Sequence, residues 1–241
     1  MNVNFTPPDE LKAVARWLRR ALLPGSCLLC GVDSGDSLLC ADCTGDLPKP
    51  PESRCPLCAD QTIHGERCGA CLKDPPDFDR VITPFRYDFP VDRIIHALKY
   101  GHQLAVAKWG ADHIAPILSD SGQTYDRLFP LPLHVDRLRE RGFNQSAEIA
   151  RNLQNSIKFR VDRSSLRRTR HTPSQADLPH KERQRNVRGA FECVTDLTGQ
   201  RVLLVDDVLT TGATANECAR VLKLHGASSV TVAVLARALK H

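Results

Sequence analysis

One segment of the chain, residues 202–214, most constrains the fold. Its first four residues, Val202-Leu203-Leu204-Val205, are all apolar and branched, which is typical of a buried strand in a parallel sheet. Two adjacent carboxylates, Asp206 and Asp207, follow directly. Ligands of such sheets bind beyond the carboxyl ends of the strands. The sequence therefore predicts a binding site at this acidic pair.

The acidic pair is followed by a short Thr/Gly loop, Thr210–Thr214, which leads into a helix that we expect over residues 215–225 with Gly226 as its stop. Free N–H groups and the helix dipole at such a start favour a phosphate. Gly212 lets the backbone approach a ligand without a Cβ clash. Residues 230–235 predict the next buried strand. This unit can hold a sugar by its hydroxyls and a phosphate by backbone N–H groups.

Three other interpretations of residues 202–214 compete. A buried strand that ends in a solvated acidic turn would leave the Thr/Gly loop as a coincidence. The magnesium-binding strand of a P-loop ATPase needs a Gly-x4-Gly-Lys-Ser/Thr loop, which the chain lacks. A dinucleotide fold needs Gly-x-Gly-x-x-Gly after a strand, which is also missing from the sequence.

The cysteines form a second pattern. Eight of the ten lie in Cys-x-x-Cys pairs, and a Cys-x2-Cys-x9-Cys-x2-Cys module occurs twice, 28 residues apart. Two residues between thiolates let one turn present both sulfurs to a tetrahedral ion, usually zinc. The simplest arrangement is one structural Zn²⁺ per module, although the spacing leaves a cross-braced arrangement open. The two predicted ligand sets are Cys27, Cys30, Cys40 and Cys43, and Cys55, Cys58, Cys68 and Cys71.

Disulfides are the main alternative for the cysteines, and they would require a secreted chain. Arg16, Arg19 and Arg20 interrupt the apolar residues of the first 23 positions, and no run approaches the length of a membrane span. We therefore expect a cytoplasmic protein with reduced or metal-bound thiols. Iron–sulfur ligation is a weaker alternative. The two cysteines outside the pattern, Cys193 and Cys218, are predicted to be small buried residues.

Charge separates the two parts of the chain. Residues 1–76 carry 8 Lys/Arg and 10 Asp/Glu, a formal −2, whereas residues 77–241 carry 25 and 18, a formal +7. The cysteine region therefore has the wrong sign for a strong binder of the phosphate backbone. We expect an N-terminal helix over 1–24, a double zinc ribbon over 25–76 and an α/β domain with a mainly parallel sheet over 77–241. Its further predicted elements are strands at 81–87 and 127–133 and helices at 91–100, 104–118 and 144–153.

Two basic segments lie in the α/β domain. In residues 130–145 a short apolar strand leads into a loop with Arg137, Arg139 and Arg141, and Asn144 is a suitable N-cap for the next helix. Arginine offers forked donors to phosphate oxygens, so pyrophosphate would suit this loop. From Lys158 to Arg188 there are ten Lys/Arg and three Asp/Glu. Long polar connections of this kind are usually functional or disordered. Solvated basic turns are the alternative for both segments.

Residues 202–214 resemble, at every position, the signature by which type I phosphoribosyltransferases bind phosphoribosyl pyrophosphate (PRPP). Together with the double zinc ribbon and the motifs Arg137-Leu-Arg-Glu-Arg-Gly-Phe-Asn-Gln145, Arg170-x-Thr172-x-x-Gln175-x-x-Leu178 and Arg185-Asn-Val-Arg-Gly-Ala-Phe191, they resemble the ComF family. These are bacterial phosphoribosyltransferase-like proteins associated with natural competence. The resemblance covers about residues 20–240 of this sequence.

The resemblance implies a type I phosphoribosyltransferase-like sheet flanked by helices, and a role for each motif. Asp206 and Asp207 would be the catalytic pair and would bind the ribose hydroxyls, directly or through Mg²⁺. The arginines at 137, 139 and 141 would contact pyrophosphate, and residues 166–191 would be a mobile loop that closes over the ligand. Parts of 80–118 would form the hood that selects the acceptor. The implied PRPP-binding segment is Asp206, Asp207, Val208, Leu209, Thr210, Thr211, Gly212, Ala213 and Thr214.

Two hypotheses of function follow. The first is an enzyme that transfers ribosyl 5-phosphate from PRPP to an unknown nitrogen acceptor and releases pyrophosphate. The second is a non-catalytic protein that binds PRPP and single-stranded DNA and handles or regulates incoming DNA, with competence-machinery proteins as partners. The basic segments favour the second. Against base stacking, the aromatic residues in or beside those segments are few: Phe143, Phe159 and Phe191.

Overall fold

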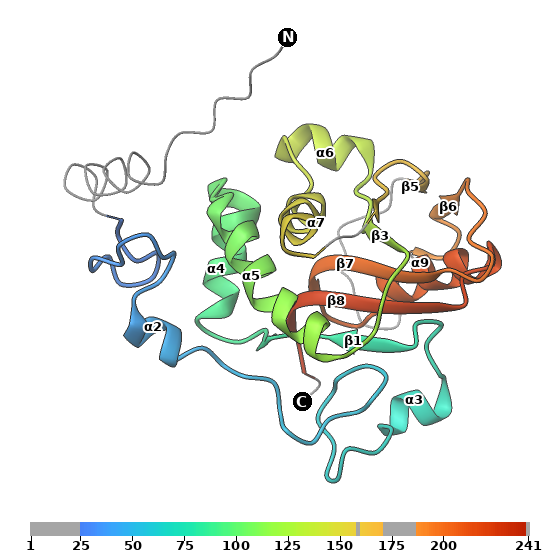
Figure 1. The fold of residues 1–241 in the computed structure, drawn as a ribbon, viewed down its shortest axis with the longest axis horizontal. Helices are drawn as coiled ribbons and strands as arrows, with labels where there is room; N and C mark the ends of the chain where they lie inside the picture. The colour runs from blue at the N-terminus through green and yellow to red at the C-terminus, as the bar shows by residue number, and fades with distance from the viewer. Residues whose placement is uncertain (1–24, 158–159, 171–186, 240–241) are drawn as a thin grey trace. The chain divides into compact units, whose positions relative to one another are not determined.

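The computed structural model describes residues 25–157, 160–170 and 187–239 of the 241-residue chain. The helix predicted within residues 1–24 and residues 171–186 of the second basic segment lie outside the described residues. The chain divides into two compact units, residues 1–47 and 48–241. The second cysteine module therefore belongs to the same unit as the α/β domain (Figure 1). None of the helices in the described part combines the length and apolar character that a membrane span needs.

The two cysteine modules have the same local structure. Each begins with a hairpin turn closed by an isolated antiparallel bridge, Ser26 with Asp33 in the first and Arg54 with Gln61 in the second. Each ends with a five-residue helix, α2 (Ala41–Gly45) or α3 (Gly69–Lys73). These pairs of positions differ by 28 or nearly 28 residues. The repeat in the sequence is therefore also a repeat of backbone structure.

The second unit contains a six-stranded parallel sheet, as predicted. Its central strands, β7 (Arg201–Leu209) and β8 (Ser229–Arg237), pair along nearly their whole length. Their apolar residues are fully buried, and burial of a Leu or Val side chain stabilises a fold by about 1.5–3 kcal/mol. The order across the sheet is β1 (Arg80–Ile82), β8, β7, β3 (Arg127–Pro130) and β4 (Arg160–Val161), and β2 (Phe85–Arg86) also pairs with β8.

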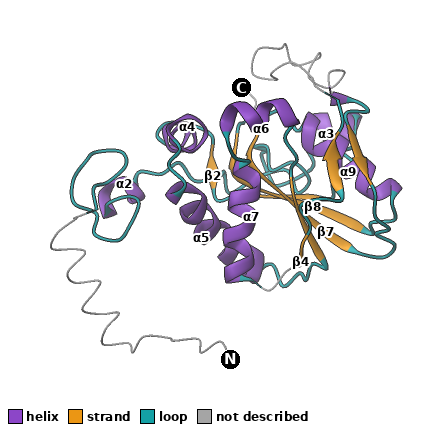
Figure 2. Cartoon of the chain, turned by 90° about the horizontal axis from the view of Figure 1, so that it is seen from above, coloured by secondary structure: helices purple, strands orange, loops and turns teal. Residues whose placement is uncertain are grey.

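The helices cover both faces of this sheet. The larger ones are α4 (Val91–Gly101), α5 (Ala105–Asp120), α7 (Gln145–Ser156) and α9 (Ala213–Leu224). The connection from β3 through α7 runs outward to β4, whereas the connection from β7 through α9 runs the opposite way, to β8. Because such crossovers are right-handed, α7 and α9 must lie on opposite faces, as Figure 2 shows. The carboxyl ends of β3 and β7 therefore form a topological switch point, where ligands of such sheets bind.

Several predicted boundaries are wrong. Strand β7 continues past Val205 to Leu209, because β8 continues beside it to Arg237. Helix α9 begins at Ala213, two residues before the predicted start. The predicted loop with three arginines is largely a helix, α6 (Val135–Arg141), which ends at Gly142 in the left-handed conformation, φ +79°.

The ends of the predicted mobile loop also have regular structure. Residues at its two ends form an antiparallel pair, β5 (Leu166–Arg168) and β6 (Phe191–Cys193). Leu166 and Phe191 are buried, 3% and 5% exposed, and this burial holds the pair against the domain. The predictions for Cys193 and Cys218 are confirmed, since both are buried. The N-cap prediction for Asn144 is confirmed as well, because its side chain accepts from the N–H groups of Ser146 and Ala147.

Gly226 gives a stability prediction. Its φ is +94°, and a Cβ there would lie 2.8 Å from the Cα of Thr198 and 2.9 Å from its backbone nitrogen. Left-handed strain costs about 1–2 kcal/mol and overpacking about 1–3 kcal/mol, so Gly226→Ala should lower the free energy of unfolding by about 2–4 kcal/mol in urea titrations. Gly122, with φ +64° and open space around its Cβ position, is the matched control. Gly122→Ala should cost only about 1 kcal/mol. Equal losses would show that the contact with Thr198 does not matter.

Candidate functional site

The acidic pair lies in β7 at the switch point and is held by two helices. Asp206 Oδ1 accepts a hydrogen bond from Ser146 Oγ at the start of α7, at 2.8 Å. Asp207 is 3% exposed, and its Oδ1 lies 3.0 Å from the ammonium nitrogen of Lys99 on α4. The other oxygen, Asp207 Oδ2, is buried and has no hydrogen-bond partner among the described residues. The site therefore keeps one buried carboxylate oxygen available for a donor or a cation.

Lys99 is a candidate site residue that the sequence analysis did not identify. Burial lowers the pKa of Lys99, but the charges of Asp207 and then Asp206 more than offset this effect and raise it. A signal for this lysine was present in the sequence. Val91, Ile95 and Lys99 are spaced by four residues, and the first two are buried, so the lysine continues a buried face of α4. A charged residue on such a face is expected to have a buried partner.

The two carboxylates differ in protonation. Burial, and then the charge of Asp207, raise the pKa of Asp206 to about 7, against the opposing effects of Lys99 and the Ser146 hydroxyl. Two adjacent carboxylates cannot both ionise at ordinary cost in such surroundings. One lysine is thus matched against two acidic groups, and a divalent cation or two sugar hydroxyls would complete the balance.

The Thr/Gly loop lies at the end of the same strand and forms the start of α9. Gly212 is the N-cap, with φ +81°, and its carbonyl accepts from the N–H of Asn216 at 2.8 Å. A Cβ on Gly212 would meet only the Phe78 ring at 3.8 Å and Leu209 at 3.9 Å, which are ordinary contacts. Within the described residues, glycine is therefore required for the backbone conformation more than for space. The loop places free helix N–H groups beside the acidic pair, as phosphate binding requires.

The three predicted pyrophosphate arginines lie on α6 instead of on a loop, and their described contacts are local. Arg139 pairs with Asp136 at 3.5 Å, and Arg137 lies 4.0 Å from Glu140. Arg141 donates to Gln145 Oε1 at 2.7 Å and lies over the Tyr100 ring, 5.5 Å from its centre. The structure therefore brings Arg141 beside α4, the helix that carries Lys99.

The two basic segments converge. Burial lowers the pKa of Arg168 on β5, and the charges of Arg137 and Arg170 lower it further. These residues belong to different predicted segments, separated by about 30 positions. Arg170 also donates to the carbonyl of Arg188 at 2.7 Å, which connects the two ends of the second segment. The fold thus gathers one basic cluster, Arg137, Arg168 and Arg170, from residues that are distant in the sequence.

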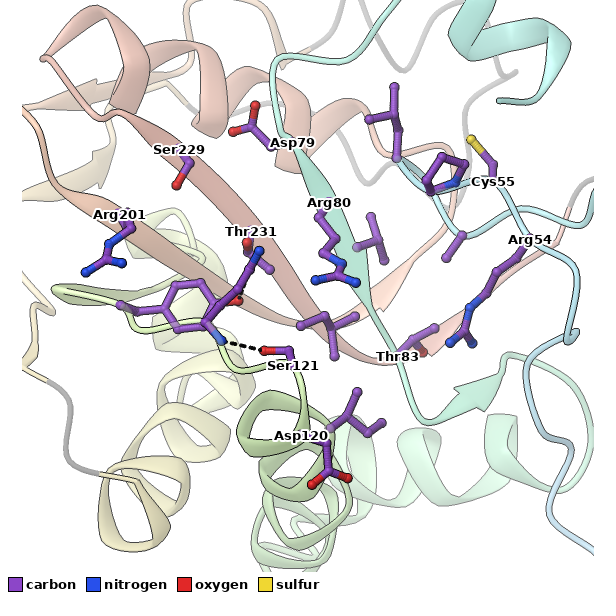
Figure 3. A pocket seen from close by; sticks show the side chains of 18 of the residues that line it. Arg54, Cys55, Asp79, Arg80, Thr83, Asp120, Ser121, Arg201, Ser229 and Thr231 are labelled. Carbon is purple, nitrogen blue, oxygen red and sulfur yellow. Dashed lines mark hydrogen bonds between the residues drawn. The ribbon is translucent and has the colours of Figure 1, made fainter. Parts of the chain in front are cut away.

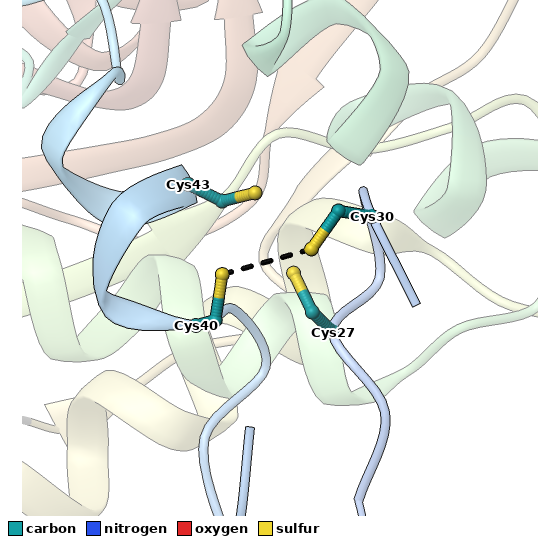
Figure 4. Close-up of side chains that lie close together, drawn as sticks. All are labelled: Cys27, Cys30, Cys40 and Cys43. Carbon is teal, nitrogen blue, oxygen red and sulfur yellow. Dashed lines mark hydrogen bonds between the residues drawn. The ribbon is translucent and has the colours of Figure 1, made fainter. Parts of the chain in front are cut away.

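Each cysteine module gathers its four sulfurs. The ligand atoms of each set lie within 4.8 Å of one another, and the first set is drawn in Figure 4. Cys30 and Cys40 sulfurs are 3.7 Å apart, and Cys58 and Cys68 sulfurs 3.6 Å. Four sulfurs at about 2.3 Å from a tetrahedral ion would be about 3.8 Å apart, so both sets fit zinc. The sets are those of the sequential arrangement, and the cross-braced alternative is wrong.

Backbone donors prepare the first cysteine of each module. Burial raises the pKa of Cys27, but N–H groups of Cys30, Cys40 and Leu29 lower it to about 6. The corresponding thiol of the second module, Cys55, has a pKa of about 7 for the same reasons, with donors at Cys58, Cys68 and Leu57. Metal binding requires thiolates. The turns therefore favour the ionised form before a metal is considered.

A cleft of about 790 Å³ lies elsewhere, at the amino ends of the central strands. Figure 3 shows Arg54, Arg80 and Arg201 around it, with Asp79 and Asp120. Arg201 is paired with Asp126 at 3.5 Å, and Asp79 with Lys223 at 2.8 Å. Because the acidic pair and the Thr/Gly loop lie at the carboxyl ends of the strands, this cleft is separate from them.

Comparison with known proteins agrees with this geometry. The phosphoribosyl transferase domain matches residues 138–241, and the double zinc ribbon domain matches residues 18–72. The DNA utilization protein YhgH of Escherichia coli is 32% identical over 225 residues, covering 90% of this chain and 99% of that protein. The chain belongs to the ComF family. Two further relatives carry competence names, and the family resemblance and the fold class predicted from the sequence are confirmed.

These two relatives are more distant. Competence protein F of Haemophilus influenzae is 29% identical over 209 residues, covering 83% of this chain and 90% of that protein. Competence protein ComFC of Streptococcus pneumoniae is 26% identical over 235 residues, covering 88% of this chain and 99% of that protein. In each case the match spans both the cysteine modules and the α/β domain of this ComF protein.

The environment of Asp206 gives a testable pKa. In ¹³C NMR titrations of the side-chain carboxyl groups, Asp206 should titrate near pH 7, because burial and Asp207 oppose its ionisation. Lys99→Met should move this midpoint upward, since Lys99 lowers the pKa of Asp206. Lys108→Met, which removes an exposed lysine paired with Asp112, should leave the midpoint unchanged. A midpoint near 4 in the wild-type protein would contradict the described environment.

Proposed function

We propose that this ComF protein binds PRPP at the switch point and transfers its ribosyl 5-phosphate to a nitrogen acceptor, with release of pyrophosphate. The observation that carries the proposal is the buried acidic pair beside a helix N-terminus, with Asp207 Oδ2 unpartnered among the described residues. A sugar phosphate needs hydroxyl acceptors and phosphate donors a few ångströms apart. Strand β7 and the loop that follows it supply both kinds of group in nine consecutive residues, 206–214.

In this proposal each group has a separate role. Asp206 and Asp207 accept hydrogen bonds from the two ribose hydroxyls, and Thr210–Thr214 bind the 5-phosphate through backbone N–H groups and threonine hydroxyls. Lys99 and Arg141 lie near one another through Tyr100 and α4, and would face the negative charge of the pyrophosphate. The α6 arginines at 137 and 139 are assigned a supporting electrostatic role. Mg²⁺ bound with PRPP would neutralise part of the charge that develops on the leaving group.

The proposed reaction requires no covalent enzyme intermediate. The lone pair of the acceptor nitrogen forms a bond to the anomeric carbon, while the bond from that carbon to the pyrophosphate oxygen breaks and its electron pair leaves with pyrophosphate. The proton displaced from the nitrogen is released to solvent or to the leaving group. Positive charge develops on the sugar ring, close to the carboxylates of β7, so positioning and electrostatics supply the catalysis. Helices α4 and α5, within the proposed hood region, are where an acceptor would be selected.

A second candidate function is supported by the basic cluster. Arg137, Arg168 and Arg170 gather positive charge from two segments, and two of the relatives are called a DNA utilization protein and a competence protein. We therefore keep the alternative that the protein binds PRPP and single-stranded DNA without catalysing transfer. Its partners would then be proteins of DNA uptake, and its place the cytoplasm. Residues 171–186 of the basic segment would belong to this surface but lie outside the described residues.

The acidic pair can be tested by binding and turnover together. Asp206→Asn and Asp207→Asn each weaken acceptors for charged hydrogen bonds worth about 1.5–3 kcal/mol, so we expect PRPP affinity to fall about tenfold to a hundredfold for each. Calorimetric titration of the zinc-loaded protein with PRPP and Mg²⁺ measures this change. Asp112→Asn, at an exposed carboxylate on α5, is the matched control and should bind normally.

Pyrophosphate release against a panel of nucleobases and amines then separates the two functions. Release with one acceptor supports the transferase, whereas binding without release across the panel supports the non-catalytic alternative. Unchanged PRPP binding in both Asn variants, or no binding by the wild-type protein, would contradict the proposed site.

The basic cluster can be tested by its salt dependence. Replacement of Arg167, Arg168 and Arg170 by Gln should weaken single-stranded DNA binding and flatten the slope of log affinity against log salt by about 0.7 per lost phosphate contact. Fluorescence anisotropy with a labelled oligonucleotide measures both. The matched control removes three arginines from the cleft of Figure 3, Arg54, Arg67 and Arg80. If the control variant loses the slope and the first variant does not, the DNA site has been placed on the wrong surface.

A further inference from the structure

The buried guanidinium of Arg237 joins the second cysteine module to the proposed phosphate loop. Arg237 is the last residue of β8 and is 2% exposed. Its Nε donates to the carbonyl of Cys58 at 2.9 Å. A terminal nitrogen donates to the carbonyls of Leu209 and Thr210, at 3.0 and 2.6 Å, and also to that of Ala238. One side chain therefore contacts a zinc-ligand residue and the first residue of the Thr/Gly loop.

This contact is more than packing, because a guanidinium remains charged at ordinary pH and its burial is costly without partners. The carboxylate of Asp60, itself 6% exposed, lies 3.9 Å from the other terminal nitrogen. The charge is therefore balanced mainly by carbonyl oxygens that must be held in position. Those carbonyls belong to the turn of the second cysteine module and to the end of β7. If either group moves, a buried charge loses its hydrogen bonds, which is expensive.

The contacts with Leu209 and Thr210 fix the direction of the loop's N–H groups. In a trans peptide the C=O of one residue and the N–H of the next point in opposite directions. The single cis bond among the described residues is Phe89–Pro90, so these peptides are trans. Because Arg237 binds both carbonyls, the N–H groups of Thr210 and Thr211 point away from it. No described residue accepts a hydrogen bond from either N–H group.

The duplication of the cysteine module provides an internal comparison. The turn has the same backbone bonds in both copies: Cys27 N–H to Val32 O and Cys55 N–H to Asp60 O, both 2.7 Å. Val32 and Asp60 are equivalent positions, 28 residues apart. Val32 is 61% exposed, so a module of this kind does not need a carboxylate there. Asp60 is thus an addition specific to the second copy, and its described ionic contact is with Arg237.

Burial distinguishes the two modules in the same way. Cys55, Cys58 and Cys71 are buried in one cluster with Phe78, Leu209 and other residues of the α/β domain. In the first module Cys30 is exposed and Cys40 and Cys43 are half-buried, and that module belongs to the other compact unit. The turn that holds the Cys58 carbonyl depends on the metal-binding sulfurs, because closed four-cysteine sites fold with their ion.

We propose that Arg237 is a positioning residue through which the metal state of the second module, and not that of the first, sets the conformation of the phosphate loop. The part of this proposal that concerns PRPP rests on the proposed function. With the second module loaded, Arg237 holds the Leu209 and Thr210 carbonyls and aims the following N–H groups at the 5-phosphate. Without its metal, the turn releases the Cys58 carbonyl and Asp60, and the loop loses its fixed geometry.

Hydrogen–deuterium exchange in the absence of PRPP tests the coupling directly. The full-length Cys27→Ser/Cys30→Ser variant has only the second ligand set intact, and is compared zinc-loaded and chelator-stripped. Stripping should speed amide exchange in residues 209–214 by about tenfold or more, the change expected when a charged hydrogen bond is lost. Exchange in α5, residues 105–120, should stay slow. In wild-type protein, selective loss of the first zinc should leave residues 209–214 unchanged.

Arg237→Lys and Asp60→Val, both made in that background, separate positioning from general stability. Lysine keeps the charge but cannot reach the separate carbonyls with a planar fork, and valine is the residue of the first module. In these variants residues 209–214 should exchange quickly even with zinc bound, and stripping should add little. If Arg237→Lys does not fold, Asp60→Val carries the test.

Three outcomes would overturn the proposal: no effect of stripping on residues 209–214, an equal effect in the variants, or loss of protection in α5 at the same zinc level. Calorimetry with PRPP is the separate second readout, and Arg237→Lys should weaken binding about tenfold. If the wild-type protein binds no PRPP, the proposed function fails, while the exchange result still decides the role of Arg237.

Discussion

The parallel pairing of β7 with β8 is the constraint on which the rest of the structure depends. It buries the most apolar residues of the chain, and it continues beyond the buried core to Leu209 and Arg237. This extension carries the acidic pair, the start of the Thr/Gly loop and the buried arginine on two adjacent strands. A strand that ended at Val205 would leave the carboxylates in a solvated turn. The ladder instead places Asp207 in the protein interior, where its charge requires Lys99.

Three elements converge on this strand end, and each contributes one polar contact. Helix α7 brings the Ser146 hydroxyl to Asp206, helix α4 brings Lys99 to Asp207, and β8 brings Arg237 to the Leu209 and Thr210 carbonyls. Because opposite crossovers leave β3 and β7 at a switch point, α7 and α9 diverge and leave space beside the carboxylates. The proposed chemistry uses this arrangement: acidic acceptors for a sugar, helix N–H groups for a phosphate, and cations for a leaving group.

The two copies of the cysteine module show how one local structure can acquire different roles. Their turns, helices and sulfur spacings agree closely, and the backbone donors that favour thiolate at Cys27 and Cys55 are equivalent. The copies differ in what surrounds them. The second contributes three cysteines to the core of the α/β domain and contacts Arg237, whereas the described residues of the first form part of a separate compact unit. Local ligand chemistry therefore determines the module, and its surroundings determine its role.

The sequence by itself determined the features that depend on neighbouring residues. The Cys-x-x-Cys spacing predicted the sulfur quartets, the apolar run of β7 predicted a buried parallel strand, and Asn144 was recognised as an N-cap, because each depends on short-range geometry. Tertiary structure decided the features that depend on partners far along the chain. Residues 135–141 were expected to be a loop, yet they form a helix between the switch point and α7. The lysine beside Asp207 comes from 108 positions earlier, and Arg237 contacts Cys58 across 179 positions. No local pattern encodes such contacts, because a buried charge finds its partners only when the fold closes around it.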